Sequence, residues 1–477
     1  MICEMSVCCG CGLCVYSCKF QAVCLKEDEE GFLYPWIDKN KCVNCGICQK
    51  MCPAINNNLS TEKLLEKERT FAGYNSNLNE LLKSSSGGAG HAIACAILRQ
   101  GGIVFGVRFN ENYRGASYTQ ITTFGELEVL RGSKYIESDR SILFERIEEA
   151  IKTGKKILVI GLPCDIAAVR SLVGVANNLY TCKLICRSNT SNRVLRQYLE
   201  KCEHKEKSSI QRLSLRYKKR NVPMLPTKIK IEYENGNISV EDFTKTDFGK
   251  AFQIMARPSC LQCNYKNIDG IADLTIGDFQ GLTGEEEYYN INGVSLICEH
   301  TEKGKELLGL IDNFYLYEVP YKEVMQYNWM IKKSIPKSPF RDEFSYYFRK
   351  DNLSVSCCKL RDEQNKILDQ IKAEFLSNKY RTAIWGIGDT NKYLFERLQM
   401  DKWNIIGVFD SSLLKIGKKF KQWQICDIKS IPAMKDQIDV LVVMIPSEEE
   451  KKLDLFLNSI GWDKRVIHVG KYKFYRG

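Results

Sequence analysis

The chain opens with CCGCGLCVYSC at residues 8–18 and returns to the same pattern in CVNCGICQKMCP at residues 42–53. Each stretch holds three cysteines separated by two residues, followed by a fourth after a gap of three. Every cysteine of the second stretch follows its counterpart by 34 positions, from 8 to 42 and from 18 to 52. This spacing indicates an internal duplication.

The duplicated spacing predicts two 4Fe–4S clusters. Three cysteines at this spacing wrap one loop around three corners of a cubane, and the fourth begins a helix that points toward the partner cluster. In two-cluster bacterial ferredoxins that fourth cysteine ligates the partner cluster. Cluster one is therefore expected on Cys8, Cys11, Cys14 and Cys52, and cluster two on Cys42, Cys45, Cys48 and Cys18.

Two other uses of cysteine fit this stretch less well. Zinc sites use two separated pairs rather than runs of three plus one. A disulfide framework is typical of secreted chains, and the sequence begins without a charged and then apolar signal segment. Cys9 and Cys24 lie outside the ligand pattern, and Cys24 is expected in the core. Lys19, which follows Cys18 where the pattern has proline, is expected to raise the potential of cluster two.

The bulk composition describes an ordinary globular protein of several domains. A chain of 477 residues is too long for one core, so two to four domains are expected. Eleven of the 22 cysteines lie within residues 1–52, which favours metal binding in a reducing, cytoplasmic setting. No apolar run approaches the length that spans a bilayer, so no membrane insertion is expected.

The net charge of +11 overstates the basicity of the chain. A 4Fe–4S core on four thiolates carries about −2, so three clusters would lower the charge to about +5. Nucleic-acid binding is therefore not expected. The basic runs at 216–220 and 415–421 are interpreted as solvated faces, with a docking surface for an acidic redox partner as the alternative.

A glycine-rich turn begins the central part of the chain, after a polar linker at 54–66. The run SSSGGAGHAIACAILRQGG, residues 84–102, predicts a turn and then a helix, and IVFGVRF after it predicts a strand. Unpaired N–H groups at such a helix start can hold a phosphate. A serine N-cap with glycine packing explains the turn equally well.

Four further cysteines are placed for a third cluster. Cys164 follows the strand KILVIG at a helix N-terminus, and Cys186 ends the strand LYTCKLIC. Cys260 and Cys263 form a C-x2-C pair, which alone is also typical of half a zinc site or a redox pair. Cys182 is a rival for one ligand position, and ordinary buried cysteines are the remaining alternative.

The order of SSSGG, RGSKYIES, GLPCDIA, LIC, SCLQC and ADLTIGDF resembles the beta subunit family of coenzyme F420 hydrogenases and dehydrogenases over about residues 67–345. A ferredoxin domain at the amino terminus is a common companion of this family. The resemblance implies FAD, a further 4Fe–4S cluster, and electron transfer between iron–sulfur clusters and a deazaflavin. Some bacterial relatives accompany surface-polysaccharide genes.

The resemblance also implies particular site residues. Those expected at the flavin are Ser85, Ser86, Gly87, Gly88, Ser133, Lys134, Tyr135, Gly277 and Asp278. Those expected at the third cluster are Cys164, Cys186, Cys260 and Cys263. Three departures from the family's pattern fall near the expected flavin or substrate: Arg187-Ser188 replaces His-Gly, Gln280 replaces Trp, and LRYKKRNVPM at 215–224 stands where the family has a basic-aromatic stretch. Arg187 is suited to hold a phosphate or carboxylate instead.

The last hundred residues predict a separate α/β unit, reached through a helical linker at 346–376. A strand, the turn Gly386-x-Gly388, a helix and the strand NIIGVFD follow one another, and Asp410 ends that strand near the ribose-contact offset of dinucleotide folds. Asn391 stands at the third glycine position. Nucleotide binding through these residues is one interpretation, and a turn that serves only close packing is the other.

The predicted fold is a multidomain α/β protein with a two-cluster ferredoxin domain at 1–55, a flavin and iron–sulfur domain at 67–345, and a Rossmann-like domain at 377–477. The predicted function is electron transfer between the clusters and a flavin, with a redox partner protein or a small-molecule substrate. The alternatives are an electron-transfer module without its own substrate site, and a nucleotide-sugar-binding protein. No hydrolytic arrangement of Ser, His and Asp is present, and the catalytic residues stay unassigned.

Overall fold

The structure, a computed structural model, describes residues 2–56, 59–387, 391–412, 415–445 and 450–474. The chain is a mixed α/β protein, as predicted, and divides into two compact units at residues 335 and 336. Among the described residues, no helix has the length and apolar character needed to cross a membrane.

The amino-terminal segment of the first unit is built from two short helices and one hairpin. Strands β1 (Val23–Glu27) and β2 (Leu33–Ile37) pair antiparallel, and helices α1 (Leu13–Tyr16) and α2 (Ile47–Lys50) flank them in sequence. The expectation that Cys24 is a core residue was wrong. Neighbouring strand residues face opposite sides, so Val23 is buried and Cys24 is exposed.

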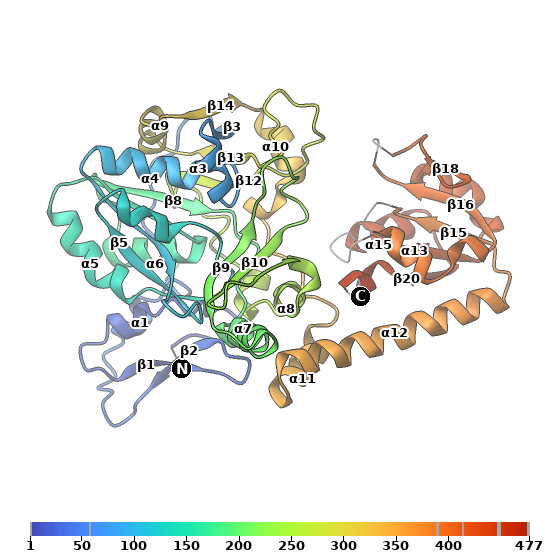
Figure 1. Cartoon of the computed structure of the whole chain (residues 1–477), viewed down its shortest axis with the longest axis horizontal. Coiled ribbons are helices and arrows are strands. Elements are labelled where there is room, and N and C mark those ends of the chain that lie inside the picture. The colour runs from blue at the N-terminus through green and yellow to red at the C-terminus, as the bar shows by residue number, and fades with distance from the viewer. Residues whose placement is uncertain (1, 57–58, 388–390, 413–414, 446–449, 475–477) are drawn as a thin grey trace. The chain divides into compact units, whose positions relative to one another are not determined.

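A nine-stranded mixed sheet forms the centre of the first unit (Figure 1). Its spatial order is β14-β3-β13-β12-β8-β7-β4-β5-β6. The four strands β4, β7, β8 and β12 run parallel in its middle. The bounds are β3 (Arg69–Asn75), β4 (Ile103–Phe109), β5 (Ala116–Ile121), β6 (Ser138–Asp139), β7 (Ile157–Gly161), β8 (Leu179–Leu184), β12 (Leu274–Asp278), β13 (Ser295–Glu299) and β14 (Phe314–Glu318).

Helices cover both faces of this sheet, because the strand period of two sends alternate apolar residues to opposite sides. Ile103 and Phe105 pack with α5 (Ser141–Lys152) and α6 (Pro163–Val173), whereas Val104 packs with α4 (Ala89–Arg99) and α9 (Glu302–Gly309). The other helices of the first unit are α3 (Leu78–Lys83), α7 (Asn192–Glu206), α8 (Asp247–Ile254) and α10 (Tyr321–Tyr327).

A three-stranded antiparallel sheet adjoins α7 and α8 in sequence, in the order β11-β10-β9. Its strands are β9 (Ile210–Tyr217), β10 (Lys228–Tyr233) and β11 (Ile238–Asp242). The predicted hairpin at Asn235-Gly236 is confirmed, and Gly236 has φ +86° there.

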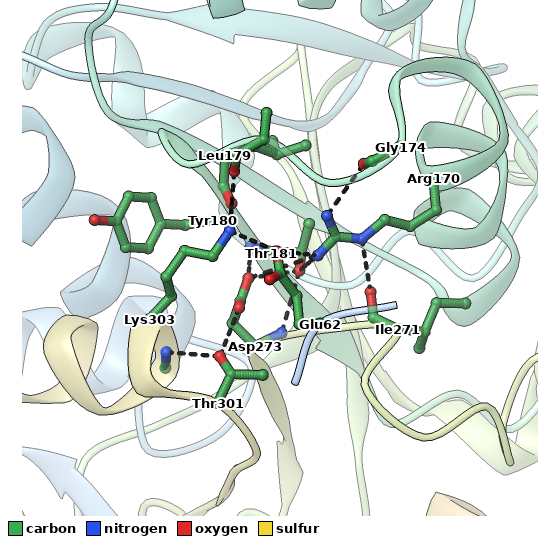
Figure 2. Close-up of polar contacts among 12 residues, drawn as sticks. Glu62, Arg170, Gly174, Leu179, Tyr180, Thr181, Ile271, Asp273, Thr301 and Lys303 are labelled. Atoms are coloured by element: carbon green, nitrogen blue, oxygen red, sulfur yellow. Dashed lines mark hydrogen bonds and ion pairs between the residues drawn. The ribbon is translucent and has the colours of Figure 1, made fainter. Parts of the chain in front are cut away.

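The segment predicted as a polar linker is tied to the sheet by a buried polar network (Figure 2). Arg170, on α6, lies 3.3 Å from a Glu62 carboxylate oxygen and 3.9 Å from one of Asp273. Lys303 also pairs with Glu62, and the Thr181 hydroxyl donates to Asp273 at 2.8 Å. The linker therefore contributes a charged side chain to the interior rather than crossing solvent freely.

The second unit contains a six-stranded sheet in the order β17-β18-β16-β15-β19-β20. The five strands from β18 to β20 run parallel. The strands are β15 (Thr382–Trp385), β16 (Ile405–Asp410), β17 (Lys419–Phe420), β18 (Trp423–Asp427), β19 (Val440–Val443) and β20 (Arg465–His468). The helices are α11 (Arg341–Lys350), α12 (Leu353–Ser377), α13 (Lys392–Arg397), α14 (Ile431–Met434) and α15 (Glu450–Ser459).

Candidate functional site

The two cysteine runs share one backbone turn. Gly12 precedes α1 with φ +79°, and Gly46 precedes α2 with φ +72°. Glycine adopts this left-handed conformation without a steric penalty, so each run can bend sharply between its second and third cysteines. The duplication in sequence is thus also a duplication in local structure.

The fourth cysteine of each run lies among the cysteines of the other run. Cys14 is buried, which raises the pKa of its thiol to about 12, and Cys8 and Cys52 are near enough to act on it. Burial likewise raises the pKa of Cys48, on which Cys18 and Cys42 act, while Cys45 is exposed. This crossed grouping is the one that two-cluster ferredoxins require.

Two cysteines outside the ligand pattern join these groups. Cys3 lies against Cys8 and Cys52, and its thiol lowers the pKa of Cys52 to about 7. Cys9 is buried and interacts with Cys11, and both line one small pocket together with Cys8, Cys14 and Cys52. The signal in the sequence was the excess of cysteines, 11 before residue 53 where the pattern needs eight.

A buried arginine holds the first run in place. The Arg257 guanidinium donates to the Cys8 carbonyl at 2.7 Å and to its Sγ at 3.8 Å. It also pairs with Glu137 and lies 4.3 Å from the Tyr34 ring centre. Hydrogen bonds and positive charge at a ligand sulfur favour the thiolate. Arg257 is a site residue that the sequence motifs did not reveal.

The four central cysteines lie in the first unit around the carboxyl ends of β7 and β8. Cys186, Cys260 and Cys263 act on one another electrostatically, and burial raises the pKa of each, that of Cys260 to about 11. Cys164 begins α6 and interacts with Cys9. Cys182, the rival for a ligand position, is fully buried among the apolar residues between the sheet and α4.

The surroundings of this third cysteine set suit an anionic group. Lys183 and Lys266 are buried, and each Nζ donates to a backbone carbonyl, that of Lys266 at 3.3 Å and that of Lys333 at 2.9 Å. Lys266 opposes the effect of burial on the pKa of Cys186 and Cys263. A buried positive charge is costly unless an opposite charge lies near it. A 4Fe–4S cluster on four thiolates, with a charge of about −2, would supply that charge.

Single metal ions are a separate case. Within the described ranges, no group of three or more His, Cys, Asp or Glu side chains is arranged to hold one ion.

A cavity of about 480 Å³ opens at the carboxyl ends of β7, β8 and β12. It is lined by eight of the residues expected at the flavin: Ser85, Ser86, Gly88, Ser133, Lys134, Tyr135, Gly277 and Asp278. Gly87, the ninth, packs against backbone instead, since a Cβ there would lie 2.2 Å from the Gly73 oxygen. Arg187 and Gln280, which depart from the family's pattern, line the same cavity.

The serine–glycine turn, residues 84–88, lies directly before α4 and places the N-terminus of that helix at the cavity. Gly88 caps the helix with φ +95°, and Ala89 and Gly90 line the cavity after it. The Ser133 hydroxyl donates to the Ser85 hydroxyl at 3.1 Å. This bond joins the turn to residues 133–135, called here the SKY segment. Unpaired N–H groups and the helix dipole at such an end favour an anion such as phosphate.

The SKY segment is held in a strained conformation. Gly132 and Tyr135 have φ +77° and +58°, and a non-glycine residue in this region is uncommon. Lys134 Nζ donates to the carbonyls of Leu130, Arg131 and Gly132, each at 2.9 Å. Burial lowers the pKa of Lys134 to about 7, but three donated bonds need the ammonium form. Lys134 therefore fixes the loop.

Arg216, in the stretch 215–224 that departs from the family's pattern, lines the cavity. It lies on β9, and its Nη1 donates to Asp278 Oδ2 at 2.7 Å in a partly buried ion pair. Its positive charge also acts to lower the pKa of the buried Tyr135 hydroxyl, against the larger opposite effect of burial. The basic run at 216–220 was interpreted as a solvated face, but Arg216 and Lys218 are turned inward: Lys218 Nζ donates to the carbonyls of Leu81, Ser86 and Asn292.

The predicted nucleotide residues of the second unit are only partly described. Gly388 lies outside the described residues. Gly386 has φ +89°, and its turn is held by Asn391, whose Nδ2 donates to the carbonyls of Gly386 and Met444. Asp410 is buried and pairs with Lys415 at 2.9 Å. Asn391 and the Asp410 carboxylate thus have partners within the protein.

Comparisons with known proteins bear on the first unit. Residues 154–323 match the family model for the C terminus of the coenzyme F420 hydrogenase/dehydrogenase beta subunit, and residues 33–54 match the model described as 4Fe-4S binding domain. No curated protein matches the chain. A chain of the F420-reducing [NiFe] hydrogenase complex from Methanosarcina barkeri is 18% identical, with 65% of this chain and 94% of that one covered and a TM-score of 0.37.

A second solved structure, that of RSP, a Rex-family repressor, is 18% identical over 20% of this chain and 54% of that one, with a TM-score of 0.17. The first family match contains the four central cysteines, Gly277 and Asp278, and the second contains the whole of the second cysteine run. The resemblance predicted from the motifs is confirmed to this extent: residues 33–54 match a 4Fe–4S binding domain, and residues 154–323 match the carboxy-terminal part of the coenzyme F420 hydrogenase/dehydrogenase beta subunit family.

Proposed function

We propose that the chain is an iron–sulfur flavoprotein that moves electrons between two ferredoxin-type 4Fe–4S clusters and an FAD in the 480 Å³ cavity. In this proposal residues 1–55 hold clusters one and two, and a third cluster on Cys164, Cys186, Cys260 and Cys263 connects them to the flavin. The substrate exchanges a hydride with the flavin. The cofactors carry the chemistry, and the chain positions and tunes them.

One observation carries the proposal: Cys186 lines the cavity together with the serine–glycine turn and the SKY segment. A cysteine of the third set therefore lies at the wall of the cavity that is proposed to hold the flavin. The cavity volume is within the range of about 300–1,000 Å³ typical of cofactor sites. The N-terminal end of α4 and the Arg216–Asp278 pair provide polar groups at this wall, which supports the proposal.

The domain assignments of the proposal follow the same evidence. The crossed cysteine grouping supports a ferredoxin fold for residues 1–55, and the helices on both faces of the nine-stranded sheet support an α/β domain at 67–345. The parallel order of β18, β16, β15, β19 and β20 supports a Rossmann-like domain at 377–477. Nucleotide binding there has less support, because Asp410 already pairs with Lys415.

A second candidate function is electron transfer to a partner enzyme without a flavin in this chain. Arg187 favours it, because its guanidinium donates to the carbonyls of Phe252 and Gln253 at the cavity wall, where the family has histidine. Both candidates require the third cluster, and only the first requires a flavin.

Iron and flavin per chain, measured on one anaerobically reconstituted sample, test the proposal. We expect about twelve irons and one flavin. Cys260→Ser should lower the iron to about eight, whereas Cys202→Ser, a partly buried cysteine on α7 outside every set, should keep about twelve. About twelve irons without flavin would support the second candidate. About eight irons and no flavin in the wild type would refute both.

A further inference from the structure

Cys9 is a buried cysteine that lies between two of the predicted clusters. Its thiol interacts with the thiol of Cys11, in the first run, and with that of Cys164, at the start of α6. The same three residues pack in one apolar group together with Cys263. Cys9 therefore contacts a predicted ligand of cluster one and a predicted ligand of the third cluster. Neither the ferredoxin spacing nor the family motifs give it a role.

Two buried donors near these thiols have no acceptor of their own. Among the described residues, Tyr265 Oη and Arg140 Nη2 lack a hydrogen-bond partner of good geometry. The other donors of Arg140 are used, Nε by Asp165 at 2.5 Å and Nη1 by the Ser138 carbonyl at 2.7 Å. A buried donor without an acceptor costs about 1–3 kcal/mol, so such a group points to an acceptor in the functional protein.

The acceptor available to both donors is sulfur. Tyr265 packs in the same apolar group as Cys9 and interacts with its thiol. The positive charge of the Arg140 guanidinium favours the thiolate form of Cys9, Cys11 and Cys164, since it acts to lower the pKa of each. Thiolate and cluster sulfurs accept such bonds, and donors around a cluster favour its reduced, more negative form.

We propose that Cys9 couples cluster one to the third cluster, so that an electron passes between them through the contact of Cys11, Cys9 and Cys164. Tyr265 and Arg140 donate hydrogen bonds to the sulfur at this junction. These bonds raise the reduction potential of the cluster there. One cluster loses one electron and the other gains it; no bond forms or breaks and no proton is transferred. The inference rests on the proposed function, because it needs the third cluster.

The test uses the full chain, reconstituted anaerobically, with iron analysis, redox titration followed by EPR, and rapid-freeze EPR after addition of less than one equivalent of reductant. Cys9→Ala should keep about twelve irons. It should slow the spread of the electron from cluster one to the third cluster by about tenfold or more, the effect expected of an outer-shell partner. Cys202→Ala is the matched control and should leave the rate unchanged.

Tyr265→Phe is the second variant, since it removes one hydroxyl and keeps the packing. It should lower the potential of a cluster at the junction by about 59 mV, the equivalent of a tenfold change for one electron. Tyr233→Phe, another buried tyrosine, is its control and should not shift either potential.

The possible results separate this inference from the proposed function. A loss of about four irons in Cys9→Ala would make Cys9 a ligand and overturn the coupling role. An unchanged rate in Cys9→Ala, in a wild type with about twelve irons, would overturn the coupling role and leave the proposed function standing. About eight irons in the wild type would overturn both.

Discussion

His91 shows how one residue at the cavity wall ties stability to pH. It lies in the first turn of α4, with Nε2 3.0 Å from both Glu80 Oε2 and Arg131 Nη2. Burial, and then the charge of Arg131, lower the pKa of His91. The unfolded chain therefore binds more protons than the folded chain at pH values around and below 6.5, and stability is lost as the pH falls through this range.

We expect the free energy of unfolding of the wild type to fall more steeply from about pH 7 to 5 than that of His91→Gln. Each unit by which the pKa is depressed is worth about 1.4 kcal/mol. Denaturant unfolding across this pH range measures the difference. His204→Gln, an exposed histidine on α7, serves as the control and should keep the wild-type slope. Equal slopes for the wild type and His91→Gln would contradict the expectation.

At the scale of elements, Arg170 connects three segments that are distant in sequence through ion pairs and hydrogen bonds. It extends from α6 to Glu62 in the 54–66 segment and to Asp273 before β12, and its Nε donates to the Ile271 carbonyl at 3.1 Å (Figure 2). Both Arg170 and Asp273 are buried. Glu62 keeps Lys303 when Arg170 is removed, but the buried Asp273 carboxylate loses its counter-charge, which is strongly destabilising.

Arg170→Ala should therefore lower the free energy of unfolding by about 3–5 kcal/mol. Arg146→Ala is the matched control, because Arg146 on α5 pairs with Glu149 in an exposed ion pair and should change stability by less than about 1 kcal/mol. Urea unfolding of the first unit, followed by near-ultraviolet circular dichroism, gives both values. A loss as small as the control's would mean that solvent replaces the network at little cost.

At the scale of the whole molecule, every cysteine expected at a cluster lies in the first unit, which has its own apolar cores. The second unit has a separate core around Trp385 and Phe409. A chain that ends at Ile335 should therefore keep the iron and flavin content of the full chain. Iron analysis and flavin assay of both chains check this expectation. A loss of about four irons would show that residues 336–477 are needed to form one of the clusters.

The features that depend on local order could be predicted from the sequence. Cysteine spacing predicted the paired runs, and the structure shows the crossed grouping in which Cys52 joins Cys8 and Cys14. Strand and turn patterns predicted the hairpin at Asn235-Gly236, and the ordered motifs predicted the family. Spacing and turn chemistry act over a few residues, so they can be read without knowledge of the fold.

The features that depend on contacts between distant segments needed the three-dimensional fold. The fold brings Ser85, Ser133 and Asp278 to one cavity, and it adds Arg216 from a run that reads as solvated surface. It places Cys9 against Cys164, 155 positions away, and turns Glu62 of the linker toward Arg170. Burial and proximity give these residues their chemistry, and both arise from the packing of segments whose separation in sequence carries no such information.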